Sequence, residues 1–205
     1  MPLKELALNG TLKSSESSEA SSTGTLLELI AEEFKQHGVE TETIRLADHN
    51  IKPAVTSDEG EGDAWRDIRK KVVEADALLI GTPFWLGQPG SICKRVLGRK
   101  DAFLEEIDDR GRMVSYGKVA AVAVVGNEDG AHLASAEVFQ ALSDVGFTIP
   151  ANAVACWVGE SMGSTNFVDP KKTPEAVQTM ISMLAGNTAH LAKLLNQSEN
   201  PEEEG

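Results

Sequence analysis

The stretch ALLIGTPFWLGQPGS, residues 77–91, decides the fold class. Its continuous apolar run at 77–80 is typical of a strand buried on both faces of a parallel sheet. A loop rich in Gly and Pro is expected at 82–90, followed by a helix at 91–103. The run VAAVAVV at 119–125 has the same fully buried character and predicts a second inner strand. Two such strands, each followed by a loop and a helix, favour an α/β protein.

The segments on either side continue the alternation of strand and helix. Leu26, Leu29, Ile30 and Phe34 repeat at the helical period before His37-Gly38, a glycine stop signal. Thr173 is expected as an N-cap with Pro174 as the first residue of the last helix, which runs to 195. Further elements are predicted as strands at 5–8, 39–46 and 148–158, helices at 64–74 and 131–145, and irregular segments at 48–63 and 159–172.

This order of elements predicts a flavodoxin-like three-layer sandwich, with a five-stranded parallel sheet in the order 2-1-3-4-5 and right-handed crossovers. One domain is expected at 1–197, and an acidic flexible tail at 198–205. In such a sheet, ligands bind beyond the carboxyl ends of the strands, where the strand order reverses. The loops after the first, third and fourth strands are therefore the places to search for chemistry.

Composition narrows the class of protein. The net charge of −13 disfavours DNA and RNA partners, because an acidic surface repels their phosphates. No apolar run approaches the roughly 18 residues of a membrane span, and no signal peptide is recognisable, so we expect a cytoplasmic protein with no membrane contact. Two separated cysteines, Cys93 and Cys156, indicate neither a disulfide framework nor a metal site.

The first loop, residues 10–25, is rich in hydroxyl groups and precedes a helix. A phosphate at a helix N-terminus gains from the unpaired backbone N–H groups and from the helix dipole. Hydroxyls and one cation are available as additional ligands, from Thr11, Lys13, Ser21, Ser22, Thr23 and Thr25. The alternative interpretation is that Ser22 or Thr23 simply caps the helix. The stretch matches neither a Walker A loop nor Gly-x-Gly-x-x-Gly, which disfavours ATP and dinucleotides there.

The second and third loops carry aromatic and glycine residues. Phe84 and Trp85 are suited to be the wall of a flat isoalloxazine ring, or alternatively pack under a helix or a second subunit. The loop at 126–130, GNEDG, allows close backbone approach to a ring. His132 either covers that ring or lies on the surface of a first helical turn. Cys93 is either a reactive thiol near a helix start or a packed core residue.

Four motifs together resemble the NADPH-dependent FMN reductase family of the flavodoxin superfamily. They are NGTLK with SST before a helix, TPFWLGQPGS before a helix that contains lysine, Tyr116-Gly117-Lys118 before a buried strand, and GNEDGAH. The resemblance spans about residues 6–195. It implies that the first loop holds the FMN phosphate, the second the ribityl chain and ring, and the third the ring edge. The residues implied are Thr11, Lys13, Ser21, Ser22, Thr23, Pro83, Phe84, Trp85, Leu86, Gly87, Gly126, Asn127, Glu128 and Gly130.

The function that this resemblance implies is an FMN-dependent oxidoreductase. Hydride would pass from NADPH or NADH to bound FMN, and electrons to a quinone, free flavin or another acceptor. The cofactor supplies this chemistry, so we expect no catalytic acid–base pair. The alternatives are a flavodoxin-type electron carrier that serves a protein partner, which the acidic surface favours, and a scaffold without flavin. The resemblance also implies a homodimer or homotetramer, with Trp85, Phe103 and the loop 159–172, including Met162, at the contact.

Overall fold

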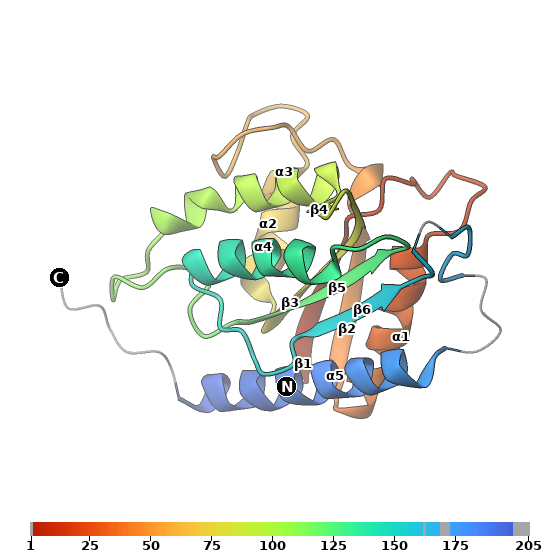
Figure 1. Cartoon of the computed structure of the whole chain (residues 1–205). Coiled ribbons are helices and arrows are strands. Elements are labelled where there is room, and N and C mark those ends of the chain that lie inside the picture. Colours follow the sequence, from red (N-terminus) through yellow and green to blue (C-terminus); the bar gives the residue numbers. More distant parts are fainter. Residues whose placement is uncertain (1, 162, 169–172, 199–205) are drawn as a thin grey trace.

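The computed structural model describes residues 2–161, 163–168 and 173–198 and shows three layers (Figure 1). The parallel sheet has the order β2-β1-β3-β5-β6, and a short antiparallel strand, β4, pairs with β3. The strands are β1 Leu3–Asn9, β2 Val39–Arg45, β3 Ala77–Trp85, β4 Gln88–Pro89, β5 Val119–Gly126 and β6 Val154–Val158. Leaving out β4, this is the predicted order 2-1-3-4-5, so the expected flavodoxin-like fold is confirmed.

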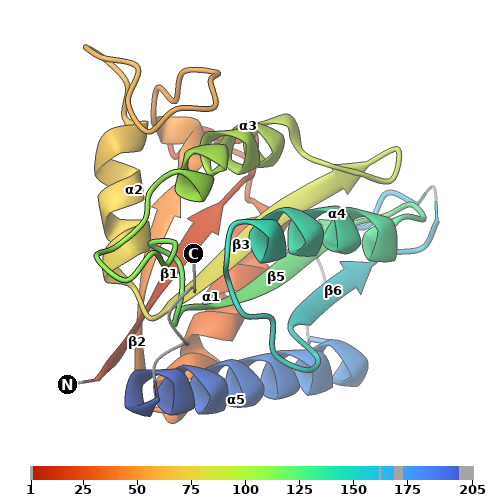
Figure 2. The same ribbon diagram turned by 90° about the vertical axis from the view of Figure 1, so that its left-hand side faces the viewer.

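Helices cover both faces of the sheet (Figure 2). On one face lie α1 Ser22–Gln36 and α5 Glu175–Gln197, and on the other lie α2 Trp65–Glu74, α3 Ser91–Arg99 and α4 Ala131–Asp144. Single 3-10 turns occur at Leu46–Asp48 (η1) and Asp101–Leu104 (η2). The described helices include none with the length and apolar character that crossing a bilayer requires.

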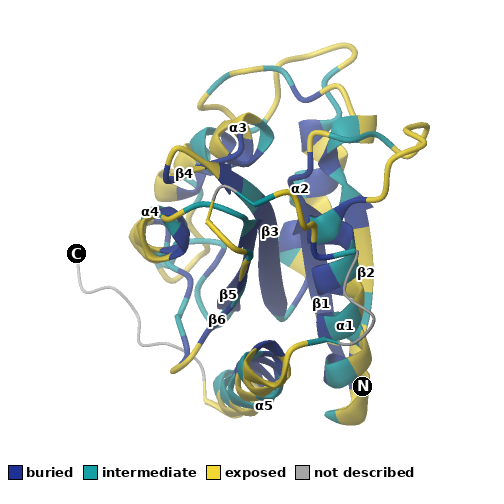
Figure 3. Cartoon of the chain, turned by 45° about the vertical axis from the view of Figure 1, so that its right-hand side comes forward, coloured by how far each residue is buried: buried dark blue, intermediate teal, exposed yellow. Residues whose placement is uncertain are grey.

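The inner strands β3 and β5 are buried almost throughout, as their continuous apolar sequences predict (Figure 3). Successive side chains point to opposite faces of the sheet, so each of these strands contributes side chains to two separate hydrophobic cores. Leu78 and Ile80 pack under α2, α3 and α4, whereas Leu79 packs under α1 and α5. The carboxyl ends of β1, β3, β5 and β6 consequently meet at one edge, where their loops gather at the right of Figure 1.

The segment 82–90, expected as a loop, is instead a β-hairpin. Strand β3 runs on to Trp85, the chain turns at Leu86-Gly87, and Gln88 and Pro89 pair back with Trp85 and Phe84. Leu86 and Gly87 both have positive φ, 53° and 73°, the geometry of a tight two-residue turn. The prediction failed because leucine is an unusual residue at the first position of that turn, which normally favours Asn or Gly.

The strand expected at 148–158 begins only at Val154. Thr148 forms an isolated bridge with Val119, and Asn152 then has a left-handed backbone with φ of 52°. Pro150 has no N–H to donate to a ladder. These features interrupt the strand, so the regular segment is β6 alone.

Two helix boundaries also differ from expectation. The helix expected at 91–103 ends at Arg99 and continues as the separate turn η2. Pro174, rather than Thr173, occupies the N-cap position of α5, and its cap makes no side-chain hydrogen bond. The predicted tail falls mostly on residues 199–205, which lie outside the described residues, as does Met162.

Candidate functional site

A pocket of about 190 Å³ lies where β1, β3, β5 and β6 end. Residues from four chain segments line it, and we call it the edge pocket: Thr11, Leu12, Lys13, Ser21, Ser22, Thr23, Pro83, Phe84, Trp85, Val125, Gly126, Asn127, Trp157 and Asn166. Ten of the fourteen residues predicted from the sequence are among them. The structure therefore brings the three predicted loops together at one hollow.

One end of the edge pocket is the start of α1. Ser21 is the N-cap, and its Oγ accepts a hydrogen bond of 3.1 Å from the Gly24 N–H. The cap is therefore neither Ser22 nor Thr23, the two candidates that the sequence offered. The N–H groups of the first helical turn have no partner within the helix, and Ser22 and Thr23 line the pocket there. Their hydroxyl groups and the helix dipole make this end suited to an anion.

The turn before this helix is fixed by short contacts. The side chain of Asn9, itself buried, accepts a hydrogen bond of 3.1 Å from the Thr11 N–H. Gly10 donates its N–H to the carbonyl of Gly81 at 2.7 Å, and a Cβ on Gly10 would lie 2.8 Å from that oxygen. The absence of a side chain at Gly10 thus lets the first loop approach β3.

Lys13, the cation predicted for this end, already has two partners. Its Nζ donates a hydrogen bond of 2.9 Å to the carbonyl of Ala20 and lies 3.0 Å from a carboxylate oxygen of Glu19. Glu19 is largely exposed, whereas the Lys13 side chain is 39% exposed. An incoming anion would therefore compete with Glu19 for the ammonium group.

The other end of the edge pocket is aromatic. Phe84 is buried, and its ring packs so closely on Gly126 that a Cβ there would lie 2.6 Å from the ring. Trp85, the next residue along β3, is 47% exposed. Of the two interpretations of this pair, core packing describes Phe84, while Trp85 presents its ring at the pocket.

The loop after β6 closes one side of the edge pocket. Trp157 packs its ring on Phe167 with centroids 5.5 Å apart, and the Asn127 side-chain N–H₂ donates a hydrogen bond of 2.8 Å to the carbonyl of Gly163. Trp157, Leu12, Val125 and Asn166 line the pocket but were not predicted. The available signal was an indole near the carboxyl end of an apolar strand, at the edge of the sheet where ligands bind.

The remaining four predicted residues line a second, more open hollow of about 680 Å³, which we call the shelf. Gly130, with φ of 129°, lies against the hairpin so tightly that a Cβ there would be 2.5 Å from the Cα of Gly87. The hairpin tip and the β5–α4 loop are thus joined. The shelf is lined by Leu86, Gly87, Glu128, Asp129, Gly130, Ala131, His132, Leu133, Cys156, Val158 and Ser161.

The family model for NADPH-dependent FMN reductase matches residues 3–160, which include nearly every residue of the edge pocket and the shelf. The chain belongs to this family. The resemblance inferred from the four motifs is confirmed.

Individual relatives of this FMN reductase family member differ in length and described activity. The chain is 33% identical over 200 residues to the divalent metal cation transporter MntH of Mycobacterium bovis, matching 94% of this chain but only 29% of that protein. It is 31% identical to 8-demethyl-8-aminoriboflavin-5'-phosphate synthase of Streptomyces davaonensis, over 97% of this chain and 80% of that one. The chain thus spans less than a third of the first relative and most of the second.

Among solved structures, the family member resembles the crystal structure of RosB with bound 8-demethyl-8-formylriboflavin-5'-phosphate. The TM-score is 0.83 at 30% identity, covering 96% of this chain and 81% of that one. The flavin derivative is bound to RosB in that crystal structure.

Three other residues singled out in the sequence of this family member have clear positions. Burial raises the pKa of the Cys93 thiol to about 12, so Cys93 is a core residue and no reactive thiolate. His132 is exposed and lines the shelf rather than the edge pocket. Phe103 is fully buried, so its predicted place at a subunit contact is wrong; its ring packs on Phe147, with centroids 6.4 Å apart, in the core.

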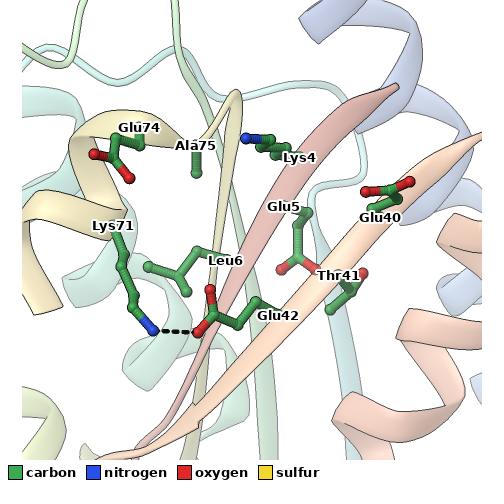
Figure 4. Close-up of a pocket in the computed structure, with 9 residues that line it drawn as sticks. All are labelled: Lys4, Glu5, Leu6, Glu40, Thr41, Glu42, Lys71, Glu74 and Ala75. Carbon is green, nitrogen blue, oxygen red and sulfur yellow. Dashed lines mark hydrogen bonds and ion pairs between the residues drawn. The ribbon is translucent and has the colours of Figure 1, made fainter. Parts of the chain in front are cut away.

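A further hollow, about 280 Å³, lies away from this edge, beside the first half of β1 and β2 and the end of α2 (Figure 4). We call it the amino-end hollow. Most of its polar side chains are of charged residue types, and Lys71 forms an ion pair with Glu42 across it. It is lined by Lys4, Glu5, Leu6, Glu40, Thr41, Glu42, Lys71, Glu74 and Ala75.

Proposed function

We propose that the edge pocket binds FMN and that the protein is an FMN-dependent oxidoreductase. The electron donor would be NADPH or NADH, and the acceptor a quinone, free flavin or another small molecule. The observation that carries this proposal is the joining, in one pocket, of a helix start with hydroxyl groups and an aromatic wall. Membership of the NADPH-dependent FMN reductase family supports it.

The donor set of the edge pocket fits the phosphate of FMN. Two N–H groups of the first turn of α1 and the hydroxyls of Thr11, Ser22 and Thr23 can donate to its oxygens. Ser21 remains occupied as the cap and holds the turn in shape. Lys13 would add a charge-assisted contact after leaving Glu19.

The aromatic end fits a flat ring. Trp85 and Trp157 offer indole faces, while Phe84 and Gly126 form a close-packed support behind them. Pro83, Phe84 and Trp85 line this pocket together with Gly126 and Asn127, so the backbone of both segments borders it. When bound, FMN supplies two-electron transfer between a nicotinamide and an acceptor. The residues of this chain would orient it, shield one side from water and leave the shelf side open.

A second candidate function follows from the relative in Streptomyces davaonensis. The alignment with that synthase covers 97% of this chain at 31% identity. The structure of RosB holds a flavin 5'-phosphate derivative. This supports an enzyme that treats a flavin 5'-phosphate as substrate in the same pocket. Incubation with FMN, an amino donor such as glutamate, and dioxygen as the oxidant, followed by mass spectrometry of the released flavin, separates the two: unchanged flavin favours the oxidoreductase, and altered ring substituents favour the synthase.

The first test is a visible spectrum of the purified protein followed by titration with FMN and FAD. We expect saturable FMN binding, weaker FAD binding because the hydroxyl end is built for a terminal phosphate, and weaker FMN binding in Ser22→Ala. Oxidation of NADPH with a soluble acceptor would then distinguish an enzyme from an electron carrier that needs a protein partner. Absence of FMN binding in this titration would overturn the proposal.

A further inference from the structure

The tip of the β3–β4 hairpin carries a residue that is unfavourable in two ways. Leu86 has a left-handed backbone with φ of 53°, in a turn whose first position favours Asn or Gly. Its side chain is also 88% exposed, so the apolar atoms gain little from folding. Strained backbone conformations of this kind cluster at active sites and ligand-binding sites. We therefore expect the Leu86 side chain to contact an apolar group from outside the described chain.

The place of Leu86 indicates what that contact is. Consecutive residues of three segments divide between the two hollows: Trp85, Asn127 and Trp157 line the edge pocket, and their successors line the shelf. The shelf is thus continuous with the open side of the edge pocket. Two further exposed apolar side chains, Leu133 at 53% and Val158 at 45%, lie on it with Leu86.

Charge narrows the class of occupant. Glu128 and Asp129 line the shelf, and neither Lys nor Arg does so among the described residues. His132 is the one histidine among the described lining residues. Phosphate or sulfonate groups would therefore meet two carboxylates, whereas an uncharged ring would lie on Leu86, Leu133 and Val158 without that repulsion.

We propose that the shelf is the binding site of an uncharged aromatic electron acceptor and that Leu86 is the residue that makes its apolar wall. Glu128 and Asp129 select against anionic acceptors of the same shape. This inference rests on the proposed function, since the acceptor must lie beside bound FMN. The occupant is a small molecule rather than a second copy of this chain, because pairing the shelf with itself would bring its carboxylates together.

The test compares Leu86→Asn with the unchanged protein, both loaded with FMN and reduced anaerobically with dithionite. Menadione, an uncharged naphthoquinone, is then mixed in; two electrons and two protons convert it to its hydroquinone, and the visible absorbance follows reoxidation. We expect the menadione concentration for half-maximal rate to rise about tenfold in Leu86→Asn through loss of apolar contact. The Kd for FMN is measured for both proteins, so that their rates are compared with FMN bound to the same extent. The Tm should rise by about 2 °C, because Asn suits the turn.

Leu194→Asn is the matched control, because Leu194 is an equally apolar, 46% exposed residue of α5 outside the shelf. Its menadione dependence should match the unchanged protein. The double variant Glu128→Gln, Asp129→Asn should improve reoxidation by a naphthoquinone sulfonate several-fold more than it improves reoxidation by menadione.

Unchanged menadione dependence in Leu86→Asn, with FMN bound normally, would overturn the shelf proposal alone. Failure of the unchanged protein to bind FMN would overturn the proposed function as well. Conversion of a dimer into a monomer by Leu86→Asn, seen by light scattering, would assign this surface to a second copy and also overturn the proposal.

Discussion

The edge pocket and the amino-end hollow lie at different parts of the same sheet and differ in what their polar groups can bind. The amino-end hollow is larger, about 280 Å³ against 190 Å³. Its polar lining consists mainly of charged side chains of both signs, with Lys71 and Glu42 already paired. The edge pocket instead combines backbone N–H groups at a helix start, hydroxyls and indole rings. Size therefore does not locate the site; the convergence of donors and aromatic rings does.

The contrast extends to a buried carboxyl group. Glu5 lies in register between Thr41 of β2 and Ala77 of β3, and Figure 4 shows it beside Thr41. It is 2% exposed, and neither carboxylate oxygen has a hydrogen-bond partner among the described residues. Burial raises the pKa of the Glu5 carboxyl to about 8. Near the amino-end hollow, therefore, burial favours the neutral form of a carboxyl group, whereas the edge pocket offers donors to an anion.

The largest predicted effect concerns Glu5. Because its folded-state pKa is about 8 against an ordinary 4.5, the folded protein keeps a proton that the unfolded chain releases in that window, so stability falls as the pH rises from 4.5 to 8. Glu5→Gln should remove this slope, gaining on the order of 3 kcal/mol over the unchanged protein near pH 7. Urea unfolding at several pH values measures it.

Two features keep that measurement interpretable. Burial lowers the pKa of Lys100 to about 7, which makes stability rise with pH between about 7 and 10.5, so the range from about pH 4.5 to 7 isolates Glu5. Glu40→Gln, at an exposed position of the same hollow, should leave the slope intact. Parallel slopes for Glu5→Gln and the unchanged protein would show that Glu5 is hydrated, and would remove the contrast drawn for this end of the sheet.

The next effect compares one lysine from each hollow. Lys13→Glu places a negative charge at the hydroxyl end of the edge pocket and should weaken FMN binding by about 1–3 kcal/mol, the range for hydrogen bonds to charged groups. Lys4→Glu makes the same charge change in the amino-end hollow and should leave the Kd for FMN unchanged. Calorimetric titration with FMN gives both values. Equal losses in the two variants would mean that overall charge, rather than a phosphate site, controls binding.

Much of this architecture could be predicted because the decisive signals are local in sequence. The apolar runs of β3 and β5 and the hydroxyl-rich stretch before α1 identify two inner strands and the loops that meet beyond them. The strand order then places those loops at one edge, which is why ten predicted residues share a single pocket.

The rest depends on contacts between distant residues. The sequence did not predict the hairpin, because Leu86 has a backbone conformation that its side chain disfavours. Trp157 is buried against Phe167, and that contact depends on the path of an irregular loop. Glu5 lies in an apolar run, and the sequence does not reveal that its carboxyl group is buried without a hydrogen-bond partner among the described residues. The pairing of Lys13 with Glu19 likewise follows from the path of an irregular loop.

That pairing yields the smallest expected effect. Glu19 and the phosphate of FMN compete for the same ammonium group, so Glu19→Gln should tighten FMN binding by a few tenths of a kcal/mol, about twofold in Kd, as befits an ion pair exposed to water. The gain should shrink at high salt, which screens the competing carboxylate. Glu16→Gln, at an exposed position of the same loop, is the control and should change the Kd less. Weaker binding in Glu19→Gln would reverse the interpretation, because Glu19 would then hold Lys13 in place for the phosphate instead of competing with it.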